Sequence, residues 1–186
     1  MKIKNLTLKE FETHKDAVSS DNILKNVVGV NSFCGNKFNI NTVTYIQVRT
    51  IEKLLTKGTS FGHICEAFIK AFNVTSEQFW SSRIHEYYEA RNFLIEEIKR
   101  LRENESKLLK SINIHSDLWT EAGGNRMSKF GNMMPLVKIG KIYGCYPYEL
   151  QKRPYMEIIT LLVLHKEEDE ITSKYNELVK NRINKK

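Results

Sequence analysis

Residues Ser82–Ile112 read SRIHEYYEARNFLIEEIKRLRENESKLLKSI, and this stretch decides how the chain folds. Apolar side chains recur at alternating steps of three and four residues, which predicts one face of a helix about 45 Å long. Two positions of this seam are polar, Arg91 and Glu105. Because the seam is narrow, we expect it to pack against one partner helix rather than inside a surrounding core. Its apolar members are Ile84, Tyr87, Leu94, Ile98, Leu101, Leu108 and Ile112.

A second long helix is predicted over Pro154–Ile183. Its first half is apolar on nearly every side, so we expect it to be the most deeply buried element. After the acidic run 167–170, the second half keeps only a thin seam built on Ile171, Tyr175 and Leu178. We infer that the polar halves of the two long helices pair with each other or with another subunit.

Shorter helices are predicted from their start and stop signals. Thr7–Glu10 and Thr75–Gln78 have the spacing of a capping box, in which two side chains satisfy the first backbone amides of a helix. A phenylalanine-rich stripe over 61–72 predicts a core-facing helix, and an amphipathic helix capped by Asn41 or Thr42 precedes it. Further short helices are predicted at 117–122, 126–130, 135–143 and from 147.

One segment departs from the helical period. Over Val27–Ile40, apolar residues alternate on both sides of Gly35 and Asn36, which predicts a small β-hairpin. The predicted fold is therefore a mainly α helical bundle with two long helices and a small β-hairpin near the N-terminus. We expect an N-terminal arm with a short helix over 1–26 and a single helical domain over 27–186. Within that domain lie the hairpin (27–40), helices (42–113) and a C-terminal helical part (116–186).

The composition indicates a folded chain in a reducing compartment. Hydrophobic residues make up 41% of the 186 residues, which is enough for a core. Three widely spaced cysteines, Cys34, Cys65 and Cys145, form no CxxC pair and predict free thiols. The N-terminus has no apolar signal region, and the longest apolar run, Ile158–Leu164, is far too short to cross a bilayer. We expect a protein of cytoplasmic origin without a transmembrane segment, and no membrane partner.

The formal net charge of +7 permits a nucleic-acid partner, although a lysine-rich solvated surface is the simpler explanation for most of the chain. Glu103 and Glu105 interrupt the basic residues of the long helix, so we expect no continuous phosphate-binding stripe there. The C-terminus is basic and is the candidate for phosphate contact. Its cationic side chains are Lys180, Arg182, Lys185 and Lys186.

Enzymatic motifs are not recognisable in this sequence. His85 and Glu86 open an HExxH-like pattern without the second histidine that zinc needs one turn later. Gly140 and Lys141 are followed by isoleucine instead of the serine or threonine of a phosphate-binding loop. We therefore expect no enzyme, no catalytic residues, no cofactor and no metal.

Two stretches, 33–49 and 119–157, carry a recognisable order of motifs. The first contains Phe33-x-x-Asn36-x-Phe38-x-Ile40 and continues as TVTYIQVR. The second contains Trp119-x-x-Ala122-Gly123-Gly124 and Arg126-Met127-x-x-Phe130-Gly131, then Tyr146-Pro147-Tyr148-Glu149-Leu150 and Pro154-Tyr155-Met156-Glu157. This order resembles small helical morphogenesis proteins of tailed bacteriophages, either tail-assembly chaperones or head-to-tail connector ring proteins. The resemblance implies a non-enzymatic virion or assembly protein, found in the virion or the host cytoplasm.

A protein of this kind works by binding other virion proteins and copies of itself, and the long Ser82–Ile112 helix fits a ring of subunits equally well. A basic helical nucleic-acid-binding module is the alternative. The residues expected at the protein interface are Phe33, Phe38, Leu94, Ile98, Leu101, Leu108, Ile171, Tyr175 and Leu178.

Overall fold

The computed structural model describes residues 6–13, 24, 26–57, 60–110 and 116–184. Over these residues the chain is mainly α-helical, as predicted. The helices, in order, are α1 (Leu8–Glu12), α3 (Tyr45–Lys57), α4 (Phe61–Phe72), α5 (Ser76–Ser81), α6 (Ile84–Leu109), α7 (Ser116–Glu121), the 3₁₀ helix η2 (Gly124–Phe130), α8 (Met133–Tyr143), α9 (Pro147–Leu150) and α10 (Tyr155–Ile183).

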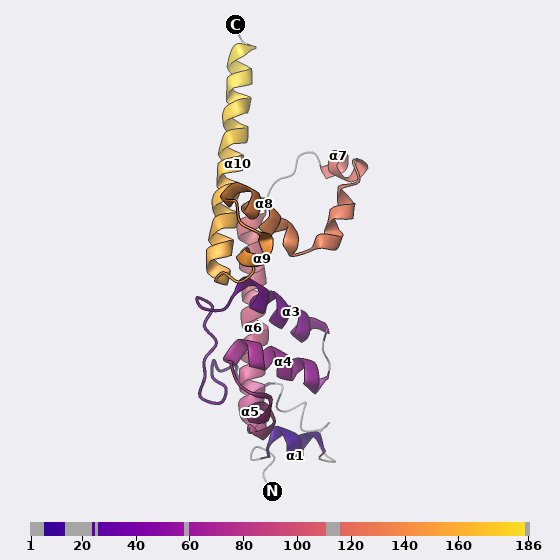
Figure 1. Ribbon diagram of the computed structural model, residues 1–186, viewed down its shortest axis with the longest axis vertical. Helices are drawn as coiled ribbons and strands as arrows, with labels where there is room; N and C mark the ends of the chain where they lie inside the picture. The colour runs from indigo at the N-terminus through magenta and orange to yellow at the C-terminus, as the bar shows by residue number, and fades with distance from the viewer. Residues whose placement is uncertain (1–5, 14–23, 25, 58–59, 111–115, 185–186) are drawn as a thin grey trace.

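Helix α6 runs along the long axis of an elongated molecule (Figure 1). Helices α1 and α3 pack against α6, α4 packs against α3 and α5, and α10 joins α6 toward the other end. Five members of the predicted seam are buried, Leu108 is exposed, and Ile112 lies outside the described residues. The buried face is wider than predicted because Tyr88 and Ala90 also belong to it. This wider face is covered by the chain's own helices.

An aromatic cluster fills the core around the first half of α6. The ring centroid of Phe33 lies 4.6 Å from that of Phe68 in an edge-to-face arrangement, and Phe68 stacks on Tyr87 at 5.5 Å. Phe72 and Phe79 complete the cluster, and all of these side chains are buried. Such pairs contribute about 0.5–1.5 kcal/mol each beyond the area that they bury.

The predicted capping boxes form at both sites. Gln78 N donates to Thr75 Oγ1 over 3.1 Å, and Thr75 N donates to Gln78 Oε1 over 2.8 Å, so the two residues cap α5 reciprocally. Thr7 and Glu10 do the same for α1. Helix α3 begins later than predicted, because Thr44 rather than Asn41 or Thr42 makes the corresponding bonds, with Gln47.

The predicted β-hairpin at 27–40 is wrong. Phe33 and Asn36 exchange two backbone hydrogen bonds around a tight turn with positive φ at Cys34 and Gly35, but no strand extends from this turn in the described part of the chain. The flanking backbone groups bond elsewhere: the Asn31 side chain bonds both backbone groups of Phe38.

The same segment is also tied to α6. Cys34 N donates to Glu86 Oε1 over 2.6 Å, and Val30 N donates to the carbonyl oxygen of Glu89. The turn is therefore held on the helix rather than within a strand ladder.

The N-terminal segment is part of the core, not a separate arm, as far as it is described. Leu6, Leu8 and Phe11 are buried, and Leu8 N donates to the carbonyl oxygen of Ser82 over 3.0 Å. Farther along the chain, α7 and η2 form an excursion away from the body before α8 returns to it (Figure 1).

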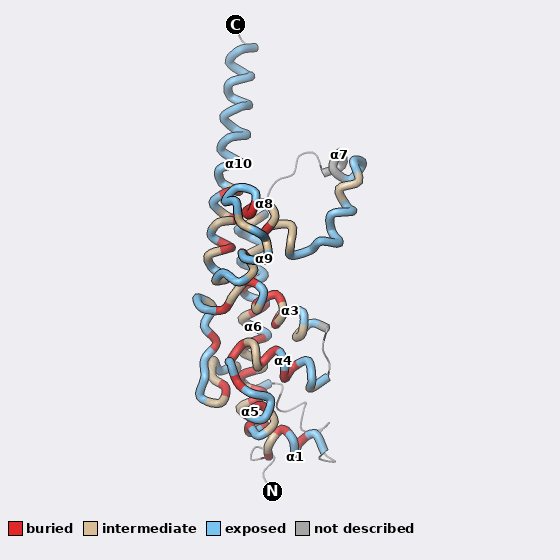
Figure 2. Tube along the Cα trace, in the orientation of Figure 1, coloured by how far each residue is buried: buried red, intermediate tan, exposed pale blue. Residues whose placement is uncertain are grey.

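Helix α10 has two halves with different surroundings (Figure 2). Its first half packs against α3, α6 and α8 and buries Tyr155, Ile158, Ile159 and Leu162. Every residue from 167 to 184 is exposed, and this projecting half extends beyond the rest of the molecule. At 1.5 Å per residue it is about 27 Å long.

Candidate protein interface

A buried polar network fixes the point at which α10 begins. Arg49 of α3 is 5% exposed, and its guanidinium Nη2 bonds Glu105 Oε1 of α6. The hydroxyl of Tyr155, the first residue of α10, donates to Glu105 Oε2 over 3.2 Å. Three helices therefore meet at one carboxylate. A buried ion pair of this kind specifies one relative arrangement of the elements that carry it, because a displaced partner leaves an uncompensated charge.

Further contacts complete the network. Arg49 Nη2 donates to the hydroxyl of Tyr45 over 3.3 Å, and its guanidinium carbon lies 4.7 Å from the centre of the Tyr45 ring. Arg49 also reaches Glu52, which accepts a 2.7 Å bond from Arg102 Nε. The rings of Tyr45 and Tyr155 stack at 6.1 Å. The arginine is thus enclosed by two aromatic faces and two carboxylates.

The surroundings shift the protonation equilibria in the direction that keeps this network intact. Burial is the largest single influence and lowers the pKa of Arg49, but the hydrogen bonds and charges of Glu105 and Tyr45 together outweigh it, and the pKa of Arg49 lies above its ordinary value. Burial is the largest cause that raises the pKa of Tyr155, and the charge on Glu105 adds to it. Burial also raises the pKa of Tyr45. The phenol groups therefore stay protonated and the guanidinium stays charged.

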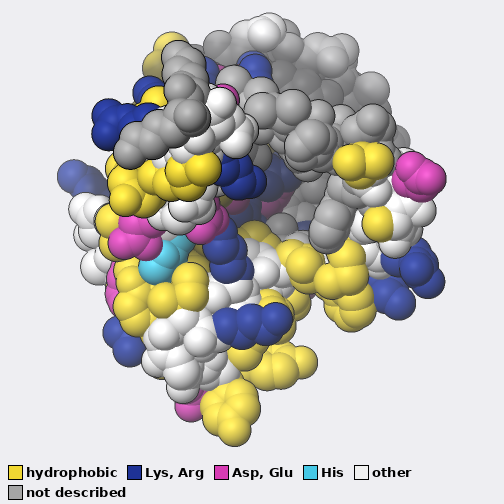
Figure 3. All heavy atoms as spheres, turned by 90° about the horizontal axis from the view of Figure 1, so that it is seen from above, with side chains coloured by type: hydrophobic (Ala, Val, Ile, Leu, Met, Phe, Trp, Pro, Cys, Tyr) yellow, Lys and Arg dark blue, Asp and Glu magenta, His cyan; other side chains and the backbone are white. Residues whose placement is uncertain are grey.

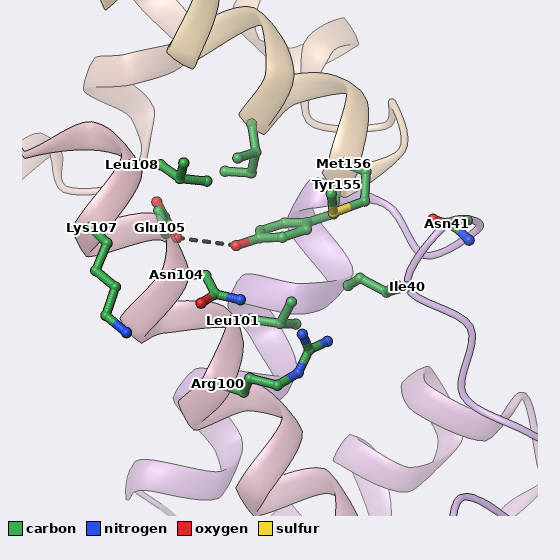
Figure 4. Close-up of a pocket in the computed structure, with 11 residues that line it drawn as sticks. Ile40, Asn41, Arg100, Leu101, Asn104, Glu105, Lys107, Leu108, Tyr155 and Met156 are labelled. Carbon is green, nitrogen blue, oxygen red and sulfur yellow. Dashed lines mark hydrogen bonds between the residues drawn. The ribbon is translucent and has the colours of Figure 1, made fainter.

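A groove of about 340 Å³ lies beside the network, between α6 and α10 (Figure 4). Leu101 and Leu108 line it from α6, and Met156 and Ile159 line it from α10. The Tyr155 hydroxyl reaches across to Glu105 among the residues that line the groove, with Leu108 on one side of this bond and Leu101 on the other (Figure 4).

Side-chain pairs hold α10 at the point where it leaves the body. His165 is buried, and its Nδ1 lies 2.9 Å from Glu168 Oε2. Lys138 of α8 forms an ion pair with Asp169. Residues 171–184 are all exposed, and this stretch of α10 extends beyond the other described helices (Figure 1). The support for α10 therefore ends near Asp169.

The projecting half carries large apolar side chains in solvent. Ile171 is 67% exposed, Tyr175 65% and Leu178 52%. Ile171, Tyr175 and Leu178 are separated by steps of four and three residues, which place them along one side of the helix. Leu164, which is also exposed, lies seven residues before Ile171 on the same side. We call Ile171, Tyr175 and Leu178 the C-terminal seam. Seen from the end at which α10 projects, apolar side chains lie among basic and acidic ones (Figure 3).

The structure divides the predicted interface residues into two groups. Five of them, Phe33, Phe38, Leu94, Ile98 and Leu101, are buried in the chain's own core, so the expectation that they face a partner is corrected. Four are accessible: Leu108, at the groove, and the three residues of the C-terminal seam. The burial of the first group follows from the packing of α3, α4 and α10 around α6.

The predicted nucleic-acid contacts lie on the same projecting half. Lys180 and Arg182 are exposed, whereas Lys185 and Lys186 lie outside the described residues. Glu177 is on the same stretch, and the acidic run 167–170 precedes it, so the cations do not form an unbroken basic surface. This arrangement does not favour phosphate tracking.

Among residues 6–13, 24, 26–57, 60–110 and 116–184, histidine, cysteine, aspartate and glutamate side chains form no group of three that could hold a metal ion. The three cysteines are not joined in disulfides. No helix in the described part of the chain is both long enough and apolar enough to span a lipid bilayer.

The sequence contains a signal for part of the polar network. Glu105 interrupts an apolar seam, which indicates an inward-facing carboxylate. Arg49 lies one turn after the buried Tyr45 and next to the buried Val48, so it shares their buried face. Comparison of the chain with protein-family models, curated proteins and solved structures gave no match.

Proposed function

We propose that this chain is a non-enzymatic assembly protein that acts by protein–protein packing, with the projecting half of α10 as its docking surface. The observation that carries the proposal is the exposure of the C-terminal seam on a helix that nothing in the described chain supports beyond Asp169. An isolated helix of this length is marginal in water. A partner that covers the seam would stabilise it by about 1.5–3 kcal/mol for each large side chain buried.

The resemblance to phage morphogenesis proteins supports the more specific part of the proposal. On that basis the chain acts in the head-to-tail connector or the tail of a tailed phage, together with other virion proteins. It would then occur in the virion or, before assembly, in the host cytoplasm. The body holds the docking helix through the Arg49–Glu105–Tyr155 network, and the projecting half meets the partner.

The test compares two variants of the full chain during infection. Tyr175→Asp combined with Leu178→Asp puts charge into the C-terminal seam, and Ser173→Asp puts the same kind of charge on the opposite face of the same helix. Mass spectrometry of purified particles and of complexes from infected cells is the readout. We expect the wild type and Ser173→Asp to be recovered with virion proteins and the double variant to be lost from them.

Circular dichroism and thermal unfolding of both variants provide the control for folding. Because residues 173, 175 and 178 are exposed, we expect the melting temperature of the body to stay near that of the wild type. Full recovery of the folded double variant with its partners would overturn the assignment of the seam as the docking surface. Failure to find the wild type with any virion protein would overturn the phage role.

A further inference from the structure

The two ends of the projecting half carry opposite charge. From Lys166 to Glu170 there is one cation and four acidic side chains. From Lys174 to Arg182 there are three cations and one acidic side chain, Glu177. Of the C-terminal seam, Ile171 directly follows the acidic stretch, and Tyr175 and Leu178 lie within the second stretch, before Lys180 and Arg182. The same helix thus displays an acidic end, an apolar middle and a basic end.

Contacts within the chain compensate only part of the acidic charge, and Glu168 pairs with His165 on its own helix. Glu167 and Glu170 share one cation, Lys166, at 3.6 Å and 3.5 Å, and Asp169 pairs with Lys138. Glu167 and Glu170 are exposed, and ion pairs between exposed side chains contribute little because water competes for both charges. These two carboxylates therefore remain available to a cationic partner.

We infer that the projecting half of α10 pairs antiparallel with the projecting half of a second copy of this chain. This inference rests on the proposed function, since it names the occupant of the same docking surface. In the antiparallel pair the acidic end of one copy faces the basic end of the other at both ends of the contact. The surface is thus its own complement, which is the requirement of a two-fold symmetric interface.

The seam sets the alignment of the two copies. Layers of an antiparallel coiled coil bring Tyr175 of one copy against Leu178 of the other, twice by symmetry. Ile171 then lies against the aliphatic stem of Arg182, whose guanidinium reaches the Glu170 end of the opposite helix. The most apolar positions form the centre, and the charged ends form the rim, as in protein interfaces generally.

Parallel pairing of two copies is disfavoured by the same charges. It would bring the four acidic residues of one copy beside those of the other, and the basic ends together as well. Like charges placed side by side on paired helices are destabilising. It would also put the two bodies next to each other, whereas antiparallel pairing puts one body at each end of the helix pair.

The first measurement is the mass of the full chain by sedimentation equilibrium over the micromolar range. We expect the wild type and Ser173→Asp to approach twice the chain mass of 21.8 kDa, and Tyr175→Asp with Leu178→Asp to remain at that mass. A wild type that stays monomeric throughout, or a double variant that dimerises like the wild type, would overturn the inference.

Charge exchange then tests the direction of pairing. A swapped variant carries Glu167→Lys, Glu170→Lys and Arg182→Glu, so the charges on the side of the helix that meets the partner are reversed. Lys180 lies seven residues after Ser173, on the face turned away from the seam, and is left unchanged. Antiparallel pairing predicts that the swapped variant dimerises with itself as tightly as the wild type does. It also predicts that a mixture forms at least tenfold less mixed dimer than random exchange would give, because like charges meet at both ends.

Parallel pairing predicts the opposite result, with mixed dimers preferred over both parents, and that outcome would overturn the inference. Fluorescence energy transfer between differently labelled chains measures the mixed species. The two proposals fail separately. If the seam variant is lost from virion proteins while the wild type is monomeric, the docking surface stands and its occupant is a different protein.

Discussion

The hydroxyl of Tyr155 donates a 3.2 Å hydrogen bond to Glu105 Oε2, which joins the first turn of α10 to the last third of α6. The other carboxylate oxygen of Glu105 bonds Arg49 on α3. One side chain of the long seam thus orients the helix that projects from the body. Removal of the Arg49, Glu105 or Tyr155 side chain should first weaken the attachment of α10 to the body.

Glu105→Ala should destabilise the fold by about 3–5 kcal/mol, because it leaves the Arg49 guanidinium buried without its anionic partner. Urea unfolding followed by circular dichroism measures the free energy of unfolding. Glu103→Ala is the matched control on the same helix, since Glu103 is exposed and only reaches Lys99 at 3.9 Å. We expect the control to lie within about 0.5 kcal/mol of the wild type. Equal losses in the two variants would contradict the role given to Glu105.

The stability of the fold should fall at alkaline pH. The pKa of Tyr155 and the pKa of Tyr45 are raised in the folded state, whereas tyrosines of the unfolded chain titrate near pH 10. The contribution of these raised pKa values to the free energy of unfolding is therefore fully present below about pH 10. It is lost as the pH rises toward the pKa values of the two tyrosines in the folded state. Tyr155→Phe should flatten this fall, measured as the free energy of unfolding at a series of alkaline pH values.

The control for the alkaline effect is Tyr175→Phe. Tyr175 is 65% exposed and belongs to the projecting half, so its removal should leave the steepness of the alkaline fall unchanged. At neutral pH, Tyr155→Phe should cost about 1 kcal/mol for the lost hydrogen bond. The same alkaline slope in Tyr155→Phe and in the wild type would show that the phenol does not titrate with unfolding.

Leu101→Asp should unfold the protein rather than only block assembly. The Leu101 side chain is 6% exposed, and an unpaired carboxylate at this position would be buried among apolar groups. Thermal unfolding by calorimetry should show a broad or absent transition for Leu101→Asp. Leu178→Asp, at an exposed leucine, should keep the transition of the wild type. A well-folded Leu101→Asp would mean that this part of α6 faces outward.

Gly140 should tolerate no side chain. A Cβ built at this position would lie 2.5 Å from the carbonyl oxygen of Cys145, so Gly140→Ala must push the chain after α8 away. We expect a loss of about 1–3 kcal/mol in the free energy of unfolding. Gly62→Ala is the comparison, because its nearest neighbour would be Ser60 Oγ at 4.0 Å. Gly62→Ala should stabilise the fold by about 0.5 kcal/mol, because alanine lowers the conformational entropy of the unfolded chain. A neutral Gly140→Ala would contradict the close approach.

Local signals predicted most of the helices. The Thr75–Gln78 pair has a spacing that is sufficient to cap a helix, and the bonds formed there. The hairpin predicted around Gly35 does not form, although the chain makes a tight turn there. Strands require the flanking backbone groups to be free for pairing, whereas the Asn31 side chain and the carbonyl oxygen of Glu89 bond those groups. Spacing along the chain could not have shown these competitors.

In the candidate interface, too, local sequence patterns predicted some features and missed others. The exposure of Tyr175 was predictable because the apolar seam of this part of the helix is too narrow to be enclosed by other helices. The pairing of Arg49 with Glu105 joins residues that are 56 positions apart, and no local period relates them. The burial of Leu94 was missed because a seam counted on one line of α6 did not include its neighbours Tyr88 and Ala90, which widen the buried face. Tertiary packing, not propensity, decided these cases.

Because α10 is one continuous helix, the packing of its first half against the body determines which side of the molecule the C-terminal seam faces. Each residue turns a helix by about 100°, so one residue inserted between Lys166 and Ile171 would aim the seam at a different side of the molecule. Seven inserted residues would bring it back to within about 20° and move it outward by about 10 Å. The hydrogen bond from Tyr155 to Glu105 thus helps to fix the rotation of α10 about its own axis. This rotation determines the direction in which the side chains near the end of α10 point.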